Sequence, residues 1–324
     1  MPSPPEFQVT SGGAVALQPV AIARKSPSRL FWDRFKQDKA ALAGGVVIIL
    51  LVLVAIFGGP LAETITGHPQ NSTYNTMTDD FGVPQGPNGS FWFGADSAGR
   101  DLFVRTLYGA RTSLFVGVVA SGIALFIGLV VGLLAGFFGG IIDTVLSRTA
   151  DVLLAVPQIL IAVGVVAACS TNKNGCLGGL IQPGLTVVIA VITLFSWSYI
   201  ARIVRGYTLS LREKEFVESA RAAGAGNVRI LATEIFPNLV GPLIVYATLL
   251  IPTNILFEAA LSYLGLGVPP DQASWGAILN DASGYYDVAW WLMVFPGAFL
   301  ILTTLAFNLL GDGLRDAFDV RSER

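Results

Sequence analysis

Residues of the types that carry catalysis are few in this chain, and their spacing fits no common catalytic or metal-binding pattern. The only histidine is His68, and the two cysteines, Cys169 and Cys176, have no further ligands nearby, so a zinc site is not expected. None of the five lysines follows a glycine, as the lysine of a phosphate-cradling loop does. These lysines are Lys25, Lys36, Lys39, Lys173 and Lys214. We therefore expect that this chain is not an enzyme and that it binds no metal or nucleotide cofactor itself.

The most unusual titratable residue is Glu258, which stands in an apolar run together with Asn254 and Ser262. Carboxylates inside a membrane are costly and usually face a bundle interior or an aqueous path. Two interpretations stay open. Glu258 lies on a translocation path or at its gate, or it lies near the external interface and bonds a neighbouring helix. The second is open because Pro269 and Pro270 place the end of the run close by.

The elements that position these residues are predicted to be transmembrane helices. The 324 residues are 53% hydrophobic and only 13% charged, whereas soluble domains carry about 25% charged residues. A bilayer core needs about 20 apolar residues in a helix, and six segments qualify. They are 40–61, 113–138, 142–168, 181–203, 239–264 and 289–310. The sequence thus predicts an all-α integral membrane protein with six transmembrane helices, and its net charge of −2 gives no basic field for nucleic acid.

Lysine and arginine mark the sides of the membrane, because they are enriched in cytoplasmic loops. One side would hold Arg24, Lys25, Arg29, Arg34, Lys36, Lys39, Arg205, Arg212, Lys214, Arg221, Arg229, Arg315, Arg321 and Arg324. The other would hold Arg100, Arg105, Arg111 and Lys173. This bias predicts that both termini are cytoplasmic, together with the loop between the fourth and fifth spans.

The predicted organisation follows from these spans. We expect a disordered cytoplasmic tail (1–29), a first transmembrane helix (30–61), an external segment (62–111), a transmembrane core (112–312) with a cytoplasmic loop (206–237), and a cytoplasmic tail (313–324). A short helix is predicted over 101–111. Pro157 and Pro252 predict kinks within spans. Gly128, Gly132 and Gly136 form a small-xxx-small pattern that predicts close helix packing.

Cys169 and Cys176 fall in the predicted external loop between the third and fourth spans. A disulfide is one alternative in an oxidising compartment, and two free thiols are the other.

The loop 206–237 carries the most distinctive pattern of the chain. Residues 211–224 are mostly good helix formers, and Gly224 can end a helix in the left-handed conformation. Phe216, Ala220 and Ala223 share one helical face, which by itself is also typical of an amphipathic helix on a membrane surface.

Glu218-Ser219-Ala220, followed by Gly224 and by Pro237, resembles the EAA loop of the permease subunits of ABC importers. The resemblance implies a short coupling helix that docks on an ATPase subunit. Ser219 replaces the usual alanine, and Thr233 and Glu234 stand where basic residues or histidine are common. The candidate coupling residues are Glu213, Phe216, Glu218, Ser219, Ala220, Gly224 and Pro237.

Three further stretches resemble dipeptide, oligopeptide and nickel permeases, and they favour the second of the two permeases of such importers. They are 93–102, 257–276 and 306–317. The first is an external signature that includes Asp96, Gly99, Arg100 and Asp101. For Arg100 and Asp101, a contact to a solute-binding protein and a local ion pair that fixes the loop both stay open.

The resemblance covers 30–320 and implies a type I ABC importer permease, with a five-helix core plus an N-terminal helix. It implies a bacterial inner-membrane location, a second permease, one or two ATPases that bind ATP and Mg, a solute-binding protein, membrane lipid, and no nucleic acid. The implied activity is ATP-driven uptake of di- or oligopeptides by alternating access. Nickel chelates or another small solute are an alternative, and an ATP-independent secondary transporter is the alternative from another class.

Overall fold

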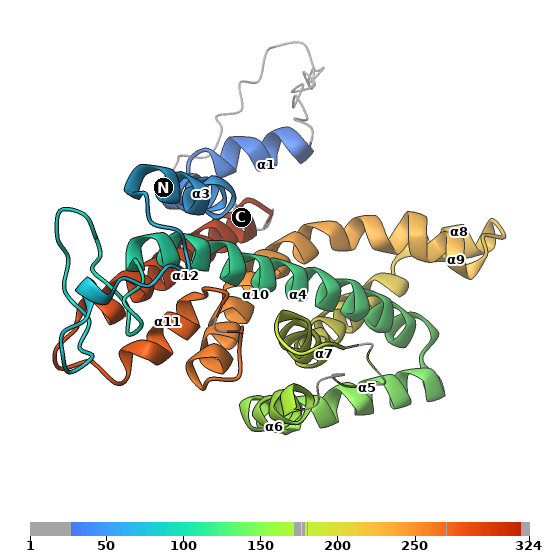
Figure 1. The fold of residues 1–324 in the computed structure, drawn as a ribbon. Helices are drawn as coiled ribbons and strands as arrows, with labels where there is room; N and C mark the ends of the chain where they lie inside the picture. Colours follow the sequence, from blue (N-terminus) through green and yellow to red (C-terminus); the bar gives the residue numbers. More distant parts are fainter. Residues whose placement is uncertain (1–26, 172–175, 177–178, 180, 270, 319–324) are drawn as a thin grey trace, which may run out of the picture.

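The protein is an all-helical bundle, as a computed structural model shows (Figure 1). The structure describes residues 27–171, 176, 179, 181–269 and 271–318. Within these residues there are helices and three isolated β-bridges but no strand. The all-α prediction is therefore confirmed. The tail predicted over 1–29 lies mostly outside the described residues, as do Lys173 and the final arginines, Arg321 and Arg324.

Among the described residues, five helices are long and apolar enough to cross a membrane, and one bent pair of helices makes a sixth span if the two cross together. The first span combines α2 (Lys39–Leu53), η1 (Val54–Gly58) and α3 (Gly59–Thr66). The others are α4 (Leu102–Phe138), the pair α5 (Gly140–Ala155) and α6 (Gln158–Thr171), α7 (Leu185–Arg212), the run α9 (Asn227–Arg229), η4 (Ile230–Ile235) and α10 (Phe236–Tyr263), and α12 (Trp291–Phe318). Shorter helices are α1 (Pro27–Phe35), η2 (Asn75–Met77), α8 (Glu215–Ala222) and α11 (Trp275–Ala282).

Several boundaries differ from the sequence prediction because local caps set them. Asp38 accepts hydrogen bonds from the amides of Ala40 and Ala41, so the first span starts at Lys39 and α1 is a separate helix. Asp101 caps α4 in the same way, and the short helix predicted over 101–111 is the first part of α4. At the other end, α12 continues to Phe318, beyond the predicted core boundary at 312.

The third span is broken rather than kinked. Helices α5 and α6 meet at an angle of 89°. The break is at Val156, whose φ of −89° and ψ of 141° are extended. A residue before proline is pushed out of the helical region by the proline ring, and here Pro157 follows. The predicted effect of Pro157 is therefore present and is larger than a kink.

Three glycines bring α4 and α7 into close contact, as the small-xxx-small pattern predicts. A Cβ atom on Gly128 would lie 2.6 Å from the Cβ of Ile200, and one on Gly132 would lie 2.6 Å from the Cβ of Val204. Gly136 stands in the same relation to Thr208 one turn further on. No larger residue fits this seam without moving a helix, so α7 is held at a fixed distance from α4.

Two sets of short elements lie at opposite ends of the bundle. In Figure 1, α8 and α9 stand at one end, and α11 and the loop that precedes α4 stand at the other. The long spans connect these two ends.

Candidate coupling loop and translocation path

Helix α8 is the centre of the predicted coupling loop, and one residue anchors it to the bundle. Val217 is fully buried in an apolar cluster with Phe137, Ile230 and Ile235. This cluster joins the end of α4 to the start of the span that contains α10. Val217 is the buried residue of α8, and Ala220 packs partly against the same cluster, whereas Phe216 and Ala223 are exposed.

The end of α8 is built as the sequence predicts. Gly224 has a φ of +81°, which glycine adopts without strain. The amide of Ala225 donates to the carbonyl of Ala220 at 3.0 Å, and the amide of Gly224 donates to that of Arg221 at 2.9 Å. These two bonds form a Schellman motif. The helix therefore stops sharply, and the chain turns into α9.

The outer face of α8 carries the other candidate coupling residues. Phe216 is 38% exposed although it is a large aromatic side chain. Glu213, Glu218 and Ser219 are exposed beside it, and Ala220 is partly buried. An exposed aromatic side chain of this kind is a residue that a partner protein can bind.

Pro237 is the second residue of α10, within a helical run that continues from Asn227 to Tyr263. Proline lacks an amide proton, and its ring clashes with the carbonyl four residues earlier. The wide π-helical turn η4 directly before it accommodates this clash. The coupling loop is thus connected to the fifth span without a break.

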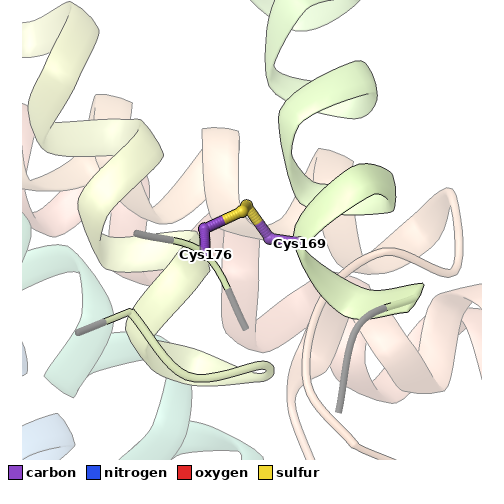
Figure 2. Close-up of a disulfide and its surroundings, with 2 residues drawn as sticks. All are labelled: Cys169 and Cys176. Carbon is purple, nitrogen blue, oxygen red and sulfur yellow. A yellow bond between two sulfur atoms is a disulfide. The ribbon is translucent and has the colours of Figure 1, made fainter. Parts of the chain in front are cut away.

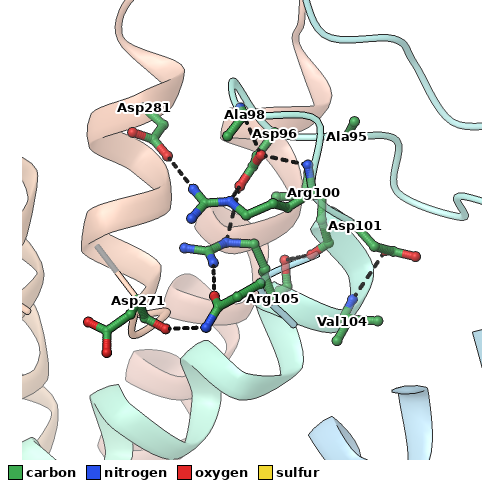
Figure 3. A network of polar contacts seen from close by, with 12 residues as sticks. Ala95, Asp96, Ala98, Arg100, Asp101, Val104, Arg105, Asp271 and Asp281 are labelled. Carbon is green, nitrogen blue, oxygen red and sulfur yellow. Dashed lines mark hydrogen bonds and ion pairs between the residues drawn. The ribbon is translucent and has the colours of Figure 1, made fainter. Parts of the chain in front are cut away.

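At the end of the bundle opposite α8, the predicted signature residues form a charged network. The Nε of Arg100 lies 2.7 Å from the Oδ2 of Asp96, and the Nε of Arg105 lies 3.1 Å from the same oxygen. Figure 3 shows both guanidinium groups directed at Asp96, with Asp281 of α11 on the far side of Arg100 at 3.8 Å. Asp96 and Arg105 are buried. The local ion pair is therefore the alternative that describes Arg100.

Burial and the neighbouring Asp96 carboxylate raise the pKa of Asp281 above the usual value of an aspartate. Arg100 and Arg105 oppose this effect. Asp281 is therefore a carboxyl group that is costly to ionise, and it lies where α11 meets the loop before α4.

The last two signature residues shape the loop itself. Asp101 accepts from the amides of Phe103 and Val104, and its other oxygen lies 2.7 Å from the Nδ1 of His68. Gly99 has a φ of +74°, and a Cβ there would lie 2.7 Å from the carbonyl oxygen of Tyr74. Both residues therefore hold the external loop against the start of α4.

Glu258 lies inside the subunit. It is fully buried and accepts hydrogen bonds from Ser113 at 2.9 Å and from Ser262 at 2.6 Å. Ser113 also accepts from the amide of Trp275 at 3.4 Å. Glu258 thus joins α4, α10 and α11, and the alternative in which it bonds its neighbours describes the structure.

Asn254 has a similar place one turn earlier. Its amide donates to Ser121 at 2.8 Å, and its carbonyl oxygen accepts from Ser196 at 2.8 Å. Asn254 and Ser262 are each 2% exposed. Neighbouring helices of this chain thus cover Asn254, Glu258 and Ser262, and a role of these residues at a translocation path or gate stays a prediction.

Comparison with known proteins agrees with this arrangement. Residues 128–324 match the model of the family described as binding-protein-dependent transport system inner membrane component. Residues 26–85 match the N-terminal TM domain of oligopeptide transport permease C. This chain belongs to the family of binding-protein-dependent transport system inner membrane components. It is a membrane pore subunit of an ABC importer, of the peptide and oligopeptide type, in a multi-pass inner-membrane fold.

Relatives of this permease are similar over most of their length. The glutathione transport system permease protein GsiD of Salmonella paratyphi A is 44% identical over 295 residues, which is 91% of each chain. The protein of the same name from Shigella flexneri is 43% identical over the same length. An inward-facing structure of the MetNI methionine ABC transporter superposes with a TM-score of 0.53 at 22% identity, over 64% of this chain and 94% of that one. This likeness shows the type I fold.

The permease contains a disulfide between Cys169 and Cys176, whose Cα atoms are 5.1 Å apart. Figure 2 shows the bond joining the end of α6 to the loop before α7. Of the two alternatives left open by the sequence, the structure has the disulfide.

Sequence reasoning missed one feature of the permease, a groove beside α7 that is lined by both polar and apolar side chains. Its upper part is a cavity of about 300 Å³. The polar side chains that line it are Gln158, Ser196, Tyr199, Tyr246 and Thr253. The signal that was present is the recurrence of hydroxyl residues along α7, at 196, 199, 207 and 210, which keeps roughly one helical face.

Proposed function

We propose that this permease forms one half of the transmembrane pore of an ATP-driven importer for peptide-type solutes. ATP and Mg are bound by separate ATPase subunits, and a second permease supplies the other half of the pore. A solute-binding protein delivers the solute at the external end. Both termini and α8 face the cytoplasm.

This proposal rests on the opposite directions in which two adjacent residues of α8 point. Phe216 points out of the bundle and Val217 points into it. A partner bound to Phe216 would move Val217 with it. The buried cluster around Val217 contains residues of α4, α7 and the α10 span. Helix α8 can therefore transmit motion of an ATPase to three spans at once.

Alternating access follows from this connection. Closure of the ATPases on ATP would move α8 and open the pore outward, and hydrolysis would reset it. Shifting a two-state equilibrium from 1:99 to 99:1 takes about 5.5 kcal/mol, which is within reach of ATP binding.

The substrate class rests on the relatives. Two of them are named glutathione transport permeases, and glutathione is a tripeptide. Peptide-type solutes are therefore the class we propose here, with nickel chelates as the alternative from the same kind of importer.

The test is purification of the tagged permease from cells that express its partner subunits. Wild-type permease should retain the second permease and the ATPases. Phe216→Ala should weaken ATPase retention by about 2 kcal/mol, the loss typical of an interface hot spot. Leu305→Ala is the matched control, because Leu305 is 53% exposed but lies in α12, away from α8. A wild-type permease that purifies alone and moves solute into liposomes without ATP would be a secondary transporter instead.

A further inference from the structure

One groove of this permease has no role in the contacts described so far. We define the α7 groove as two adjoining cavities. The upper one, introduced above, measures about 300 Å³. The lower one, of about 450 Å³, is lined by Arg202, Ile203, Gly206, Tyr207, Ser210 and Tyr246. Tyr246 lines both cavities, so the groove follows α7 from the middle of the span toward its cytoplasmic end.

The groove gathers hydrogen-bonding groups within membrane spans. Hydroxyl and amide groups in such a place are costly unless they have partners. Gln158, Tyr199 and Tyr246 make no side-chain hydrogen bond with any part of the chain that the structure describes. Tyr199 is 50% exposed and lines the upper cavity. These three side chains are therefore available to bond water or a solute.

The polar side chains of the groove lie on other faces of α7 and α10 than the exposed apolar residues of these helices do. Leu194 of α7 and Ile244 of α10 are 43% and 42% exposed. Each lies well around its helix from the groove, since Leu194 precedes Ser196 by two residues and Ile244 precedes Thr253 by nine. Those two faces carry apolar residues, whereas the upper cavity combines the polar side chains named above with Leu154, Phe195, Leu249 and Leu250. Sites for small molecules are typically apolar with a few placed polar groups, so this mixed lining fits a solute that carries both amide groups and apolar side chains.

Hydrogen bonds between buried side chains behind the groove hold its wall in place. Ser196 donates to Asn254, which in turn donates to Ser121 of α4. These bonds lock the groove side of α7 to α10 and to α4 at one level. The groove is therefore a formed surface, held by buried hydrogen bonds.

The charge of the groove decides what it can bind. Arg202 is the charged residue among those that line it, and its Nη2 lies 2.5 Å from the Oδ1 of Asp151. The pair is neutral as a unit, so the groove favours neither cations nor anions. The remaining groups, hydroxyls and a carboxamide, can each donate and accept a hydrogen bond.

We propose that the α7 groove binds the amide groups of the solute during transport, through Gln158, Tyr199 and Tyr246. An amide N–H and C=O need neighbours that both accept and donate, which these side chains supply. A short zwitterionic solute rich in amide groups, with variable side chains, is the class that a neutral groove admits. This inference rests on the proposed function, and it assigns that function a solute contact surface.

The first test asks whether the groove is aqueous, and it needs no solute. Both native cysteines are in the disulfide, so single cysteines can be introduced without other changes. Tyr199→Cys and Thr253→Cys should react with a membrane-impermeant thiol reagent much faster than the controls Leu194→Cys and Ile244→Cys, in the complete importer in open membrane vesicles. Equal rates at all four positions would overturn the groove assignment.

The second test asks whether the groove recognises amide groups. Tyr199→Phe and Tyr246→Phe each remove one hydroxyl and keep the ring. In proteoliposomes that hold the complete importer and its binding protein, glutathione uptake should fall about 3- to 10-fold for each, the effect of one hydrogen bond. Tyr286→Phe is the control, because Tyr286 is 63% exposed and lies outside the groove.

The outcomes separate this inference from the proposed function. If the wild-type importer takes up glutathione and both groove variants match it, the recognition role is wrong and the importer stands. If the wild-type importer takes up neither glutathione nor a dipeptide with ATP present, the solute class and the peptide proposal both fail. The labelling result then decides by itself whether the groove is part of an aqueous path.

Discussion

The Nη1 of Arg212 lies 3.1 Å from the carbonyl oxygen of Gly136, so the last residue of α7 caps the end of α4. A second carbonyl, that of Phe137, lies at 3.4 Å. The ring of Phe137 in turn lies 5.6 Å from the guanidinium of Arg221 in α8. The coupling loop is thus joined to α4 by polar contacts as well as by the buried Val217.

Arg212→Ala should loosen this joint. The carbonyls at the end of α4 lose a charged donor, and because Arg212 is partly exposed, the cost to stability should be about 1 kcal/mol. ATP-driven uptake should fall more than the amount of assembled complex does. Arg229→Ala, at an exposed position of the same loop, is the control for loss of charge. Equal effects of the two changes on uptake would show that the cap at α4 has no role in coupling.

Gly132→Leu should be strongly destabilising. A side chain at this position would meet the Cβ of Val204 at 2.6 Å and the carbonyl of Ala201 at 2.7 Å. Overpacking of this kind costs about 1–3 kcal/mol, or more when backbone must move. Gly122→Leu in the same helix is the control, because nothing lies within 4 Å of the Cβ position there. Thermal unfolding in detergent should show a lower Tm for Gly132→Leu alone, and equal values would contradict the close α4–α7 seam.

The features predicted correctly from the sequence are those that local chemistry determines. The apolar runs predicted the five helices of spanning length and the apolar stretch of the bent pair α5 and α6. The spacing of Gly128, Gly132 and Gly136 predicted a close helix contact. The left-handed Gly224 gave the end of α8. Each depends on a few neighbouring residues, so no knowledge of the tertiary structure was needed.

The features that were missed depend on residues far apart in the chain. Ser113 is 145 positions from Glu258, so the sequence could not show whether this carboxylate has a buried partner. The α7 groove takes its polar residues from three helices, α6, α7 and α10, so no single stretch of the sequence contains all of them. Pro157 predicted a bend, but the 89° angle also depends on how α5 packs against α7.

Glu258→Leu and Glu258→Gln should differ in a way that tests the role of this residue as a joint. Leucine leaves the hydroxyls of Ser113 and Ser262 without their acceptor, at a cost of about 1–3 kcal/mol. Glutamine keeps an acceptor and should retain most of the stability and most of the uptake. The measurement is Tm in detergent beside uptake in proteoliposomes. A Glu258→Gln variant with wild-type Tm and no uptake would return Glu258 to the translocation path.

Asp281 should give the external joint a pH dependence that its removal abolishes. Its pKa is raised in the folded protein, chiefly by burial and next by Asp96, so the folded state holds this proton more tightly than the unfolded state does. The stabilising contribution of Asp281 is therefore fully present below the unfolded value of about 3.9, and it is lost as the pH rises through the folded pKa. As the pH rises through this acidic window, the Tm of the wild type should therefore fall relative to the Tm of Asp281→Asn. Asp287→Asn, at an exposed position beyond α11, should keep the wild-type profile. If Asp281→Asn and the wild type have parallel Tm profiles from pH 4 to 7, burial at this joint does not oppose ionisation of Asp281.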